Sequence, residues 1–455
     1  MLSFNLIRKD KWPLYAAAAV LVISVLVLGD HLLKATGGIF SLPRDESFFQ
    51  LSIAKNLAFR RVWGIGRYDF AAASPSILYP LVLAVIFFIF GAHLTVVPAI
   101  NTVIAIYLLV VVQRWLAKRN ITSVNQLFIL LAVNILSFLP GMVVYGMESP
   151  LLLLLTFLFV SRLIDEWQLT EFSRRTLIYG ALMVASRYDG VLLVGSICLL
   201  LLWGRKWLRA FELTLWCLLP VLIFGYISLF KGGFFIPNQF ILQSASPLIS
   251  YDWLVGCATA IAVPSTRNVL VHRRQIKAML VVSISVGVII LILVTTNLYA
   301  VKALDRNSLV TYKMNYPIAK FAHRYYYRNG IASDDIGMIS FLADGGYLDL
   351  SGVASLKIAR SKLDHLFSPG LVSRLSQELN ARVAIVSDRY DKVLEDNWVR
   401  TASWELPGCG TMTFYAADST DAFHLREHLD DYAPFLPRDI TAQYFYTLPP
   451  EKKGS

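Results

Sequence analysis

The chain has 455 residues, of which 56% are hydrophobic and 16% are charged, and its mean hydropathy is +0.57. Soluble proteins carry about 25% charged residues, so this composition excludes a soluble enzyme of two or three domains. It also excludes a disordered chain, which would contain far fewer apolar residues. The apolar runs are long and unbroken and lack the alternation of barrel strands, so we predict a polytopic α-helical membrane protein.

The net charge of +11 comes from Lys and Arg residues that lie in small clusters between apolar runs. This distribution is typical of the positive-inside bias of membrane proteins. We therefore expect membrane lipids as partners and no nucleic acid.

The first apolar run, residues 14–29, follows Arg8, Lys9 and Lys11. We interpret it as an uncleaved helix whose N-terminus lies in the cytoplasm, because no clear small-residue cleavage site follows it. The first outer loop then spans residues 30–69. This orientation is the one expected of a multi-pass protein in a bacterial cytoplasmic membrane.

Residues 70–113 contain no Asp, Glu, Lys or Arg and are followed by a basic cluster that begins at Arg114. Two crossings in this stretch would leave the cluster outside, against the positive-inside rule, whereas one crossing places it inside. We therefore predict that residues 75–91 enter the membrane from the outer side without crossing it.

Residues 176–204 would form a single helix of about 44 Å, longer than the hydrocarbon core of about 30 Å. Such a helix would also place the basic residues before and after it on opposite sides of the membrane. Two short helices with a turn at residues 187–190 keep both basic groups inside. The turn would then lie within the outer half of the membrane, where irregular backbone is tolerated only beside a cavity or inside protein.

The remaining apolar segments bring the total to about nine crossings and place the C-terminus outside. These segments are residues 121–147, 150–164, 213–230, 252–271 and 278–301. Residues 1–301 are thus the predicted membrane domain, and residues 302–455 a small outer α/β domain. In that domain we expect strands at residues 336–340, 382–387 and 411–416, and helices at residues 316–327 and 371–379.

Arg44-Asp45-Glu46, in the first outer loop, is the first candidate for chemistry. Two adjacent carboxylates beside an arginine can supply a general base and a clamp for a substrate or metal ion. The loop is rich in Lys and Arg, among them Lys55, although outer loops are usually poor in them. This excess favours an anionic partner such as a lipid phosphate. An amphipathic helix over residues 48–57 with a solvated charged face explains the same composition equally well.

Glu148 and the turn Arg187-Tyr188-Asp189 carry charge close to or inside the predicted bilayer. Ionisable groups are costly there, which makes them candidates for function. Two ordinary explanations compete: Glu148 can interact with the dipole of the following helix, and Arg187 and Asp189 can neutralise each other. For the turn we favour a polar cavity. Asn238, which follows a proline after a Gly-Gly pair, is by itself only a turn signal.

His424, Glu427 and His428 match the spacing of an inverted zincin motif. A zincin needs a further carboxylate ligand on a downstream helix, and the residues that follow are few and rich in proline. We therefore predict a solvated helix here and no metal site.

Several short motifs follow one another in the order found in a known family. They are Asp45-Glu46 with Ala54-Lys55-Asn56-Leu57, then Ser74-Pro75, then Gly146 through Leu151, then Arg187-Tyr188-Asp189-Gly190, and finally Pro237-Asn238. In this order the chain resembles the polytopic GT-C glycosyltransferases that use polyprenyl-phosphate sugars, and most closely the branch containing the mycobacterial terminal β-arabinofuranosyltransferase. The resemblance covers about residues 40–240. Leu348 through Gly352 also resembles a segment of the family.

The chain departs from the family pattern at three places. Ser52 stands where relatives often have Arg, Tyr188 replaces a usual Pro, and the region after Asn238 is shorter. Because of these departures, the resemblance does not determine how the donor is bound or which sugar is transferred.

The resemblance implies inverting transfer of a sugar from a polyprenyl-phosphate donor to a glycan or lipid-linked acceptor at the outer face. Asp45 would deprotonate the acceptor, and Glu46 would position the acceptor or a metal, so the need for a divalent cation stays open. Arg187 would bind the donor phosphate, with Arg44 or Lys55 as alternatives. We further expect these residues to line the substrate cavity: Asn56, Glu148, Tyr188, Asp189 and Asn238.

Two other classes compete with this hypothesis. A transporter or flippase of a lipid-linked anion would show inverted repeats and paired broken helices, and the sequence contains one broken pair. A membrane-anchored surface module without catalytic activity would not need so many crossings.

Overall fold

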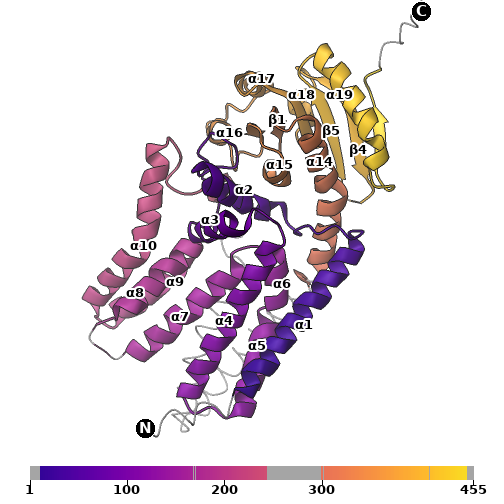
Figure 1. Ribbon diagram of the computed structural model, residues 1–455. Coiled ribbons are helices and arrows are strands. Elements are labelled where there is room, and N and C mark those ends of the chain that lie inside the picture. Colours follow the sequence, from indigo (N-terminus) through magenta and orange to yellow (C-terminus); the bar gives the residue numbers. More distant parts are fainter. Residues whose placement is uncertain are drawn as a thin grey trace, which may run out of the picture.

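The computed structural model describes residues 11–167, 169, 171–242, 299–300, 302–408 and 410–447. Its N-terminal part is built of helices, several of them long and apolar, and its C-terminal part contains a mixed β-sheet covered by helices (Figure 1). We call these parts the helical domain (residues 12–242) and the sheet domain (residues 316–447). A linking helix, residues 302–325, connects to the sheet domain and contains a π-helical turn, Thr311–Asn315.

Three helices of the helical domain are each long and apolar enough to cross a membrane: α1, α4 and α10. α5 and α6 pass the same test only as a pair, with a bend of 42° between them, which is the geometry of a broken span or of a re-entrant loop. α3 and α9 are shorter apolar helices. The bounds are α1 Trp12–Ala35, α3 Leu78–Phe90, α4 Val96–Lys118, α5 Ser123–Leu136, α6 Leu139–Tyr145, α7 Ser149–Glu166, α8 Arg174–Ser186, α9 Gly190–Trp203 and α10 Trp207–Phe230. Large apolar side chains such as Leu26, Phe88 and Phe230 are exposed, as expected of surfaces that face lipid. The chain is thus a helical membrane protein with a C-terminal α/β domain.

The predicted break within residues 176–204 is confirmed, because α8 ends at Ser186 and α9 begins at Gly190. The predicted span at residues 121–147 is divided into α5 and α6, where Phe138 adopts a left-handed conformation just before Pro140. α3 has 13 residues, which is about 20 Å and too short to cross the hydrocarbon core upright. The predicted crossing at residues 252–271 and almost all of the one at 278–301 lie outside the described residues, so the number of crossings stays a prediction.

The sheet domain contains six strands in the order β2-β1-β3-β5-β4-β6. β1, β2 and β3 are parallel, whereas β5, β4 and β6 are antiparallel to their neighbours. The bounds are β1 Gly330–Ser333, β2 Tyr347–Asp349, β3 Ala381–Ser387, β4 Val399–Leu406, β5 Gly410–Ala416 and β6 Thr441–Tyr444. The helices are α14 Tyr316–Tyr325, α15 Gly337–Leu342, α16 Leu356–Leu363, α17 Pro369–Glu378, α18 Asp391–Leu394 and α19 Ser419–Tyr432.

The predictions for this domain are confirmed for β3, β5, α14 and α17. The strand predicted at residues 336–340 is wrong, because this segment forms the short helix α15. A short apolar run does not distinguish a strand from a buried helical turn. Here the helix is favoured because its first N–H groups find an acceptor in the distant side chain of Asp45.

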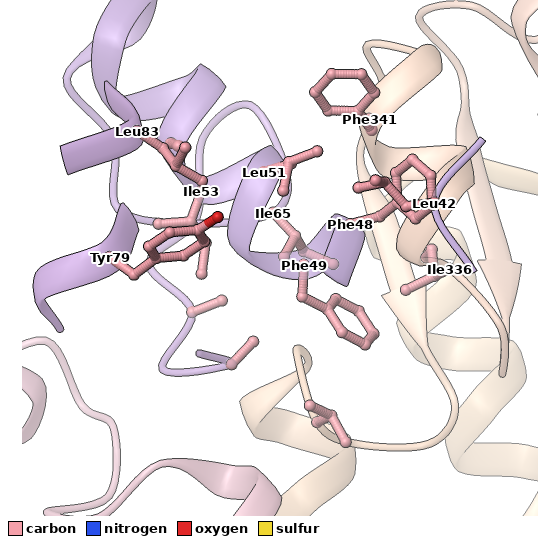
Figure 2. Packing of buried hydrophobic residues seen from close by; sticks show 14 of the residues in the cluster. Leu42, Phe48, Phe49, Leu51, Ile53, Ile65, Tyr79, Leu83, Ile336 and Phe341 are labelled. Carbon is pink, nitrogen blue, oxygen red and sulfur yellow. The ribbon is translucent and has the colours of Figure 1, made fainter. Parts of the chain in front are cut away.

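α2, Asp45–Arg60, is the element that joins the two domains, because it packs against α3 on one side and α15 on the other. Figure 2 shows Phe48 beside Ile336 and Phe341 of the sheet domain, whereas Ile53 faces Tyr79. The prediction of an amphipathic helix with a solvated charged face is therefore only half correct. The helix is present, but residues 47–54 are all buried, including three polar side chains.

Candidate functional site

A cavity of about 700 Å³ lies where the loop between α1 and α2, the linking helix and the sheet domain meet. We call it the junction cavity. Its wall is formed by Pro43, Arg44, Asp45, Glu46, Tyr299, Lys302, Ala303, Arg306, Asn307, Val310, Thr311, Asn315 and Asp335. Two wall residues, Thr311 and Asn315, belong to the π-helical turn of the linking helix. Such turns are frequent at functional sites, because they redirect side chains that a regular helix would point elsewhere.

Asp45, the first residue of α2, is held against the N-terminus of α15. Its Oδ2 accepts a hydrogen bond from the backbone N–H of Gly337 at 2.8 Å, and its Oδ1 accepts one from Met338 at 2.9 Å. Residue 337 has to be glycine for this approach, because a Cβ there would lie 2.2 Å from Asp45 Oδ2. The carboxylate is thus fixed in one orientation, with lone pairs left on its oxygens for further donors.

Asp335 reaches the same cavity from the turn that follows β1. Its Oδ2 accepts a hydrogen bond from Asn315 Nδ2 at 2.9 Å, and its carboxyl group is hydrogen-bonded to that of Asp45. Burial, then the carboxylates of Asp45 and Asp334, raises the pKa of Asp335 well above its ordinary value. The cavity therefore contains a carboxyl group, that of Asp335, which binds a proton more tightly than an ordinary aspartate does.

Glu46 and three cations complete the charged wall of the junction cavity. Glu46 is exposed, and no hydrogen bond or ion pair to another described residue holds it. The guanidinium of Arg44 lies 5.1 Å from the ring centroid of Tyr145. Arg44, Lys302 and Arg306 are exposed, and no carboxylate of the described chain lies within ion-pair distance of them. An anionic ligand would meet three cations there beside the Asp45 carboxylate.

Glu148, Arg187 and Asp189 are also brought together, at a different place. Arg187 Nη1 lies 3.0 Å from Glu148 Oε1, and Arg187 Nε lies 3.1 Å from Asp189 Oδ2. Gln50 of α2 donates to Glu148 Oε2 at 2.7 Å. The side chain of Glu148 is 0% exposed and that of Arg187 is 13% exposed. We call Gln50, Glu148, Arg187 and Asp189 the Arg187 cluster; none of the four lines the junction cavity.

The other predicted site residues hold the fold together. Lys55 donates to the carbonyl of Phe341 at 2.6 Å, at the end of α15 opposite to Asp45, and burial lowers its pKa to about 8. Asn56 Nδ2 donates to three successive carbonyls of the loop after α2, beginning with Gly64 at 2.8 Å.

Asn238 and Tyr188 also lie outside the junction cavity. Asn238 links the two domains, since its Nδ2 donates to Gly352 O at 3.3 Å. Gly352 is the last residue of the segment Leu348 through Gly352, which the sequence analysis compared with a segment of the GT-C family. Tyr188 is buried, with its ring 5.9 Å from that of Phe240.

His428, from the zincin-like motif, packs inside the sheet domain. Its ring stacks on Tyr325 at 4.5 Å, and its Nδ1 lies 3.1 Å from the hydroxyl of Tyr326. Over the residues that the structure describes, no group of three or more His, Cys, Asp or Glu side chains is arranged to hold a metal ion.

The sequence analysis missed Asp335, Lys302 and Arg306. Asp335 follows the end of a parallel strand, a position where ligand-binding side chains gather in α/β sheets. This signal could not be used, because the strand was predicted at residues 336–340 and lies at Gly330–Ser333. The two cations lie at the start of the linking helix, where basic residues resemble any membrane-flanking cluster.

Residues 304–423 match a family model described as a domain of unknown function (DUF8728). The matched region includes six wall residues of the junction cavity and does not include α2. The six are Arg306, Asn307, Val310, Thr311, Asn315 and Asp335. Neither the curated proteins nor the solved structures contain a match to this chain.

Proposed function

We propose that the protein is an inverting membrane glycosyltransferase of the GT-C type. It would transfer a sugar from a polyprenyl-phosphate donor to a glycan or another cell-envelope acceptor. The observation that supports this proposal is the junction cavity, where the carboxylate of Asp45, the base expected from the sequence, lies beside three exposed cations. A carboxylate and a cluster of cations are the two groups that this reaction needs.

In the proposed reaction the acceptor hydroxyl attacks the anomeric carbon of the donor while Asp45 removes its proton. The bond between that carbon and the phosphate oxygen breaks, and polyprenyl phosphate leaves with the negative charge. Each oxygen of Asp45 accepts one N–H from α15. One of them also meets the carboxyl group of Asp335, and the other keeps a lone pair for the acceptor. Glu46, at the same wall, would position the acceptor.

The phosphate of the leaving group needs cationic stabilisation. We assign this role to Arg44, which the sequence offered as an alternative, together with Lys302 and Arg306. Arg187 contacts two carboxylates in a buried cluster, and Lys55 is bound to the end of α15. Because both side chains already bind groups of the protein, they are poorer candidates for binding the phosphate of a lipid donor.

The proposed orientation places the N-terminus inside and the sheet domain outside, with about nine crossings. In this arrangement the junction cavity lies at the outer surface, where a polyprenyl chain can lie along the apolar helices while its phosphate reaches the cations. A cysteine at the exposed position 46 would then react with an impermeant thiol reagent from outside. Reaction only after membrane disruption would exclude this orientation.

A transporter or flippase of a lipid-linked anion is the second candidate. The Arg187 cluster favours it, because charged groups at a break between membrane helices are typical of transport pathways. A flippase would move the labelled lipid across vesicles without breaking its bond to the sugar.

The test is sugar transfer by the purified full-length protein in vesicles, with a panel of labelled polyprenyl-phosphate sugars. We expect Asp45→Asn to lower kcat by about 10²-fold or more, because the general base is lost. Asp364→Asn is the matched control, since this carboxylate is exposed on the sheet domain and is not in the wall of the junction cavity. Wild-type kcat in Asp45→Asn would overturn the assignment of the base. Lipid movement without transfer by the wild type would favour the flippase.

A further inference from the structure

The carboxyl groups of Asp45 and Asp335 meet in the junction cavity from opposite domains. They are hydrogen-bonded to each other. A hydrogen bond between two carboxyl groups requires that one of them carries a proton, because two carboxylates offer only acceptors and repel each other. We therefore infer that the pair holds one proton in the folded protein.

The surroundings decide which carboxyl group is protonated. Asp45 accepts two backbone N–H groups at the first turn of α15, which favour negative charge. Asp335 accepts one neutral side-chain amide, that of Asn315. The proton therefore belongs to Asp335, and Asp45 keeps the charge that a base needs.

The other charged groups around the pair come from three elements. Arg44 and Glu46 lie on the first outer loop and α2, and Lys302 and Arg306 on the linking helix. Asp334 lies next to Asp335, and its carboxylate accepts a hydrogen bond from the N–H of Ser387 at 2.9 Å. Asp334 is thus already engaged by β3, whereas the carboxyl group of Asp335 is directed to Asp45.

We propose that Asp335 is a positioning residue of the sheet domain that shares a proton with Asp45 and holds the base in its reactive orientation. The inference rests in part on the proposed function, because it assigns Asp45 as the base of that reaction. In the proposed step the acceptor proton passes to Asp45, while Asp335 keeps its own proton. The sheet domain thus contributes to the catalytic site itself.

A pair of this kind loses its protons in two steps. The active form has one proton, on Asp335. At higher pH the second proton leaves, the two carboxylates repel each other, and Asp45 moves away from the acceptor. The wild type is therefore expected to lose kcat on the alkaline side of its pH profile.

The test compares the pH profiles of kcat for the wild type, Asp335→Asn, Asp335→Ala and Asp334→Asn. We expect Asp335→Asn to keep kcat at the optimum within about threefold and to lose the alkaline fall, since an amide donates to Asp45 without titrating. Asp335→Ala should lower kcat by about tenfold or more with little change in KM. Asp334→Asn is the matched control and should keep the alkaline fall. An alkaline fall that persists in Asp335→Asn would overturn the positioning role.

A second measurement does not depend on sugar transfer. Infrared spectra of the purified full-length protein at neutral pH should contain the band of a protonated carboxyl group that disappears in Asp335→Asn and persists in Asp334→Asn. The band should shift in Asp45→Asn, because the hydrogen-bond partner changes. If the band behaves in this way and no donor is consumed, the proton-sharing pair stands and the proposed function fails. A spectrum that Asp335→Asn leaves unchanged would overturn the pair.

Discussion

The junction cavity and the Arg187 cluster both gather charged residues that stand out in the sequence, and α2 reaches both of them. In the Arg187 cluster the guanidinium contacts two carboxylates, and Glu148 is fully buried. In the junction cavity three exposed cations have no carboxylate at ion-pair distance within the described ranges, and a ligand can reach them. The comparison teaches that a charged residue in an apolar chain is a candidate for ligand binding only where its side chain is exposed and is not already paired within the protein.

The largest effect on stability is expected from Arg187→Ala. This change removes the cation that contacts Glu148 and Asp189 and leaves two buried carboxylates without it. Losing one partner of a buried ion pair costs about 3–5 kcal/mol of unfolding free energy. Thermal unfolding in detergent would measure the loss, with Arg306→Ala at the junction cavity as the matched control, expected to change stability by less than about 0.5 kcal/mol. Equal losses in the two variants would remove the distinction between the two regions.

A smaller loss is expected from Gly337→Ala, which tests how Asp45 is held at the junction cavity. The new Cβ would lie 2.2 Å from Asp45 Oδ2, so the carboxylate or α15 has to move. We expect a loss of about 1–3 kcal/mol, as for other overpacked sites, together with a lower kcat. Gly346→Ala is the control, because its Cβ would meet only Leu379, at 3.9 Å. Similar unfolding temperatures for the two variants would show that Asp45 does not depend on this close approach.

The cations of the junction cavity should affect binding and not stability. Lys302→Gln and Arg306→Gln each remove one positive charge near the proposed phosphate. We expect KM for the donor to rise by about tenfold, which corresponds to about 1.4 kcal/mol, with an unchanged unfolding temperature. Lys320→Gln, an exposed change on α14 away from the cavity wall, is the control. If only the Arg187 variants change KM, the phosphate site belongs to the buried cluster.

Sequence reasoning succeeded where local chemistry decides the structure. The break at residues 187–190 follows from charge placement and helix length, and β3 and β5 follow from short apolar runs between turns. Asp45 and Glu46, adjacent in sequence, were expected at one site and do line one cavity.

What could not be predicted depends on contacts between distant parts of the chain. Asp45 and Gly337 are separated by 292 positions, and their hydrogen bond, which favours a helix at α15, cannot be inferred from the local sequence. The same contact brings Asp335 to Asp45. The resemblance gave Arg187 the donor phosphate as its ligand, and no local pattern reveals that Glu148 contacts it from 39 positions away.

The smallest effect is expected at the other end of α15, where Lys55 donates to the carbonyl of Phe341. Burial lowers the pKa of Lys55 from 10.5 to about 8 in the folded protein, although the charge of Asp344 opposes this. Between these two values the unfolded chain binds a proton that the folded protein does not, so the stability of the wild type rises with pH across that window. In Lys55→Met this rise should be absent, whereas Lys357→Met, an exposed change on α16, should keep it. Unfolding temperatures of the three proteins, measured from about pH 8 to about pH 10.5, would test this across the window between the two pKa values. A rise that persists in Lys55→Met would show that Lys55 stays charged in the folded state and that α15 is held by charge at both ends.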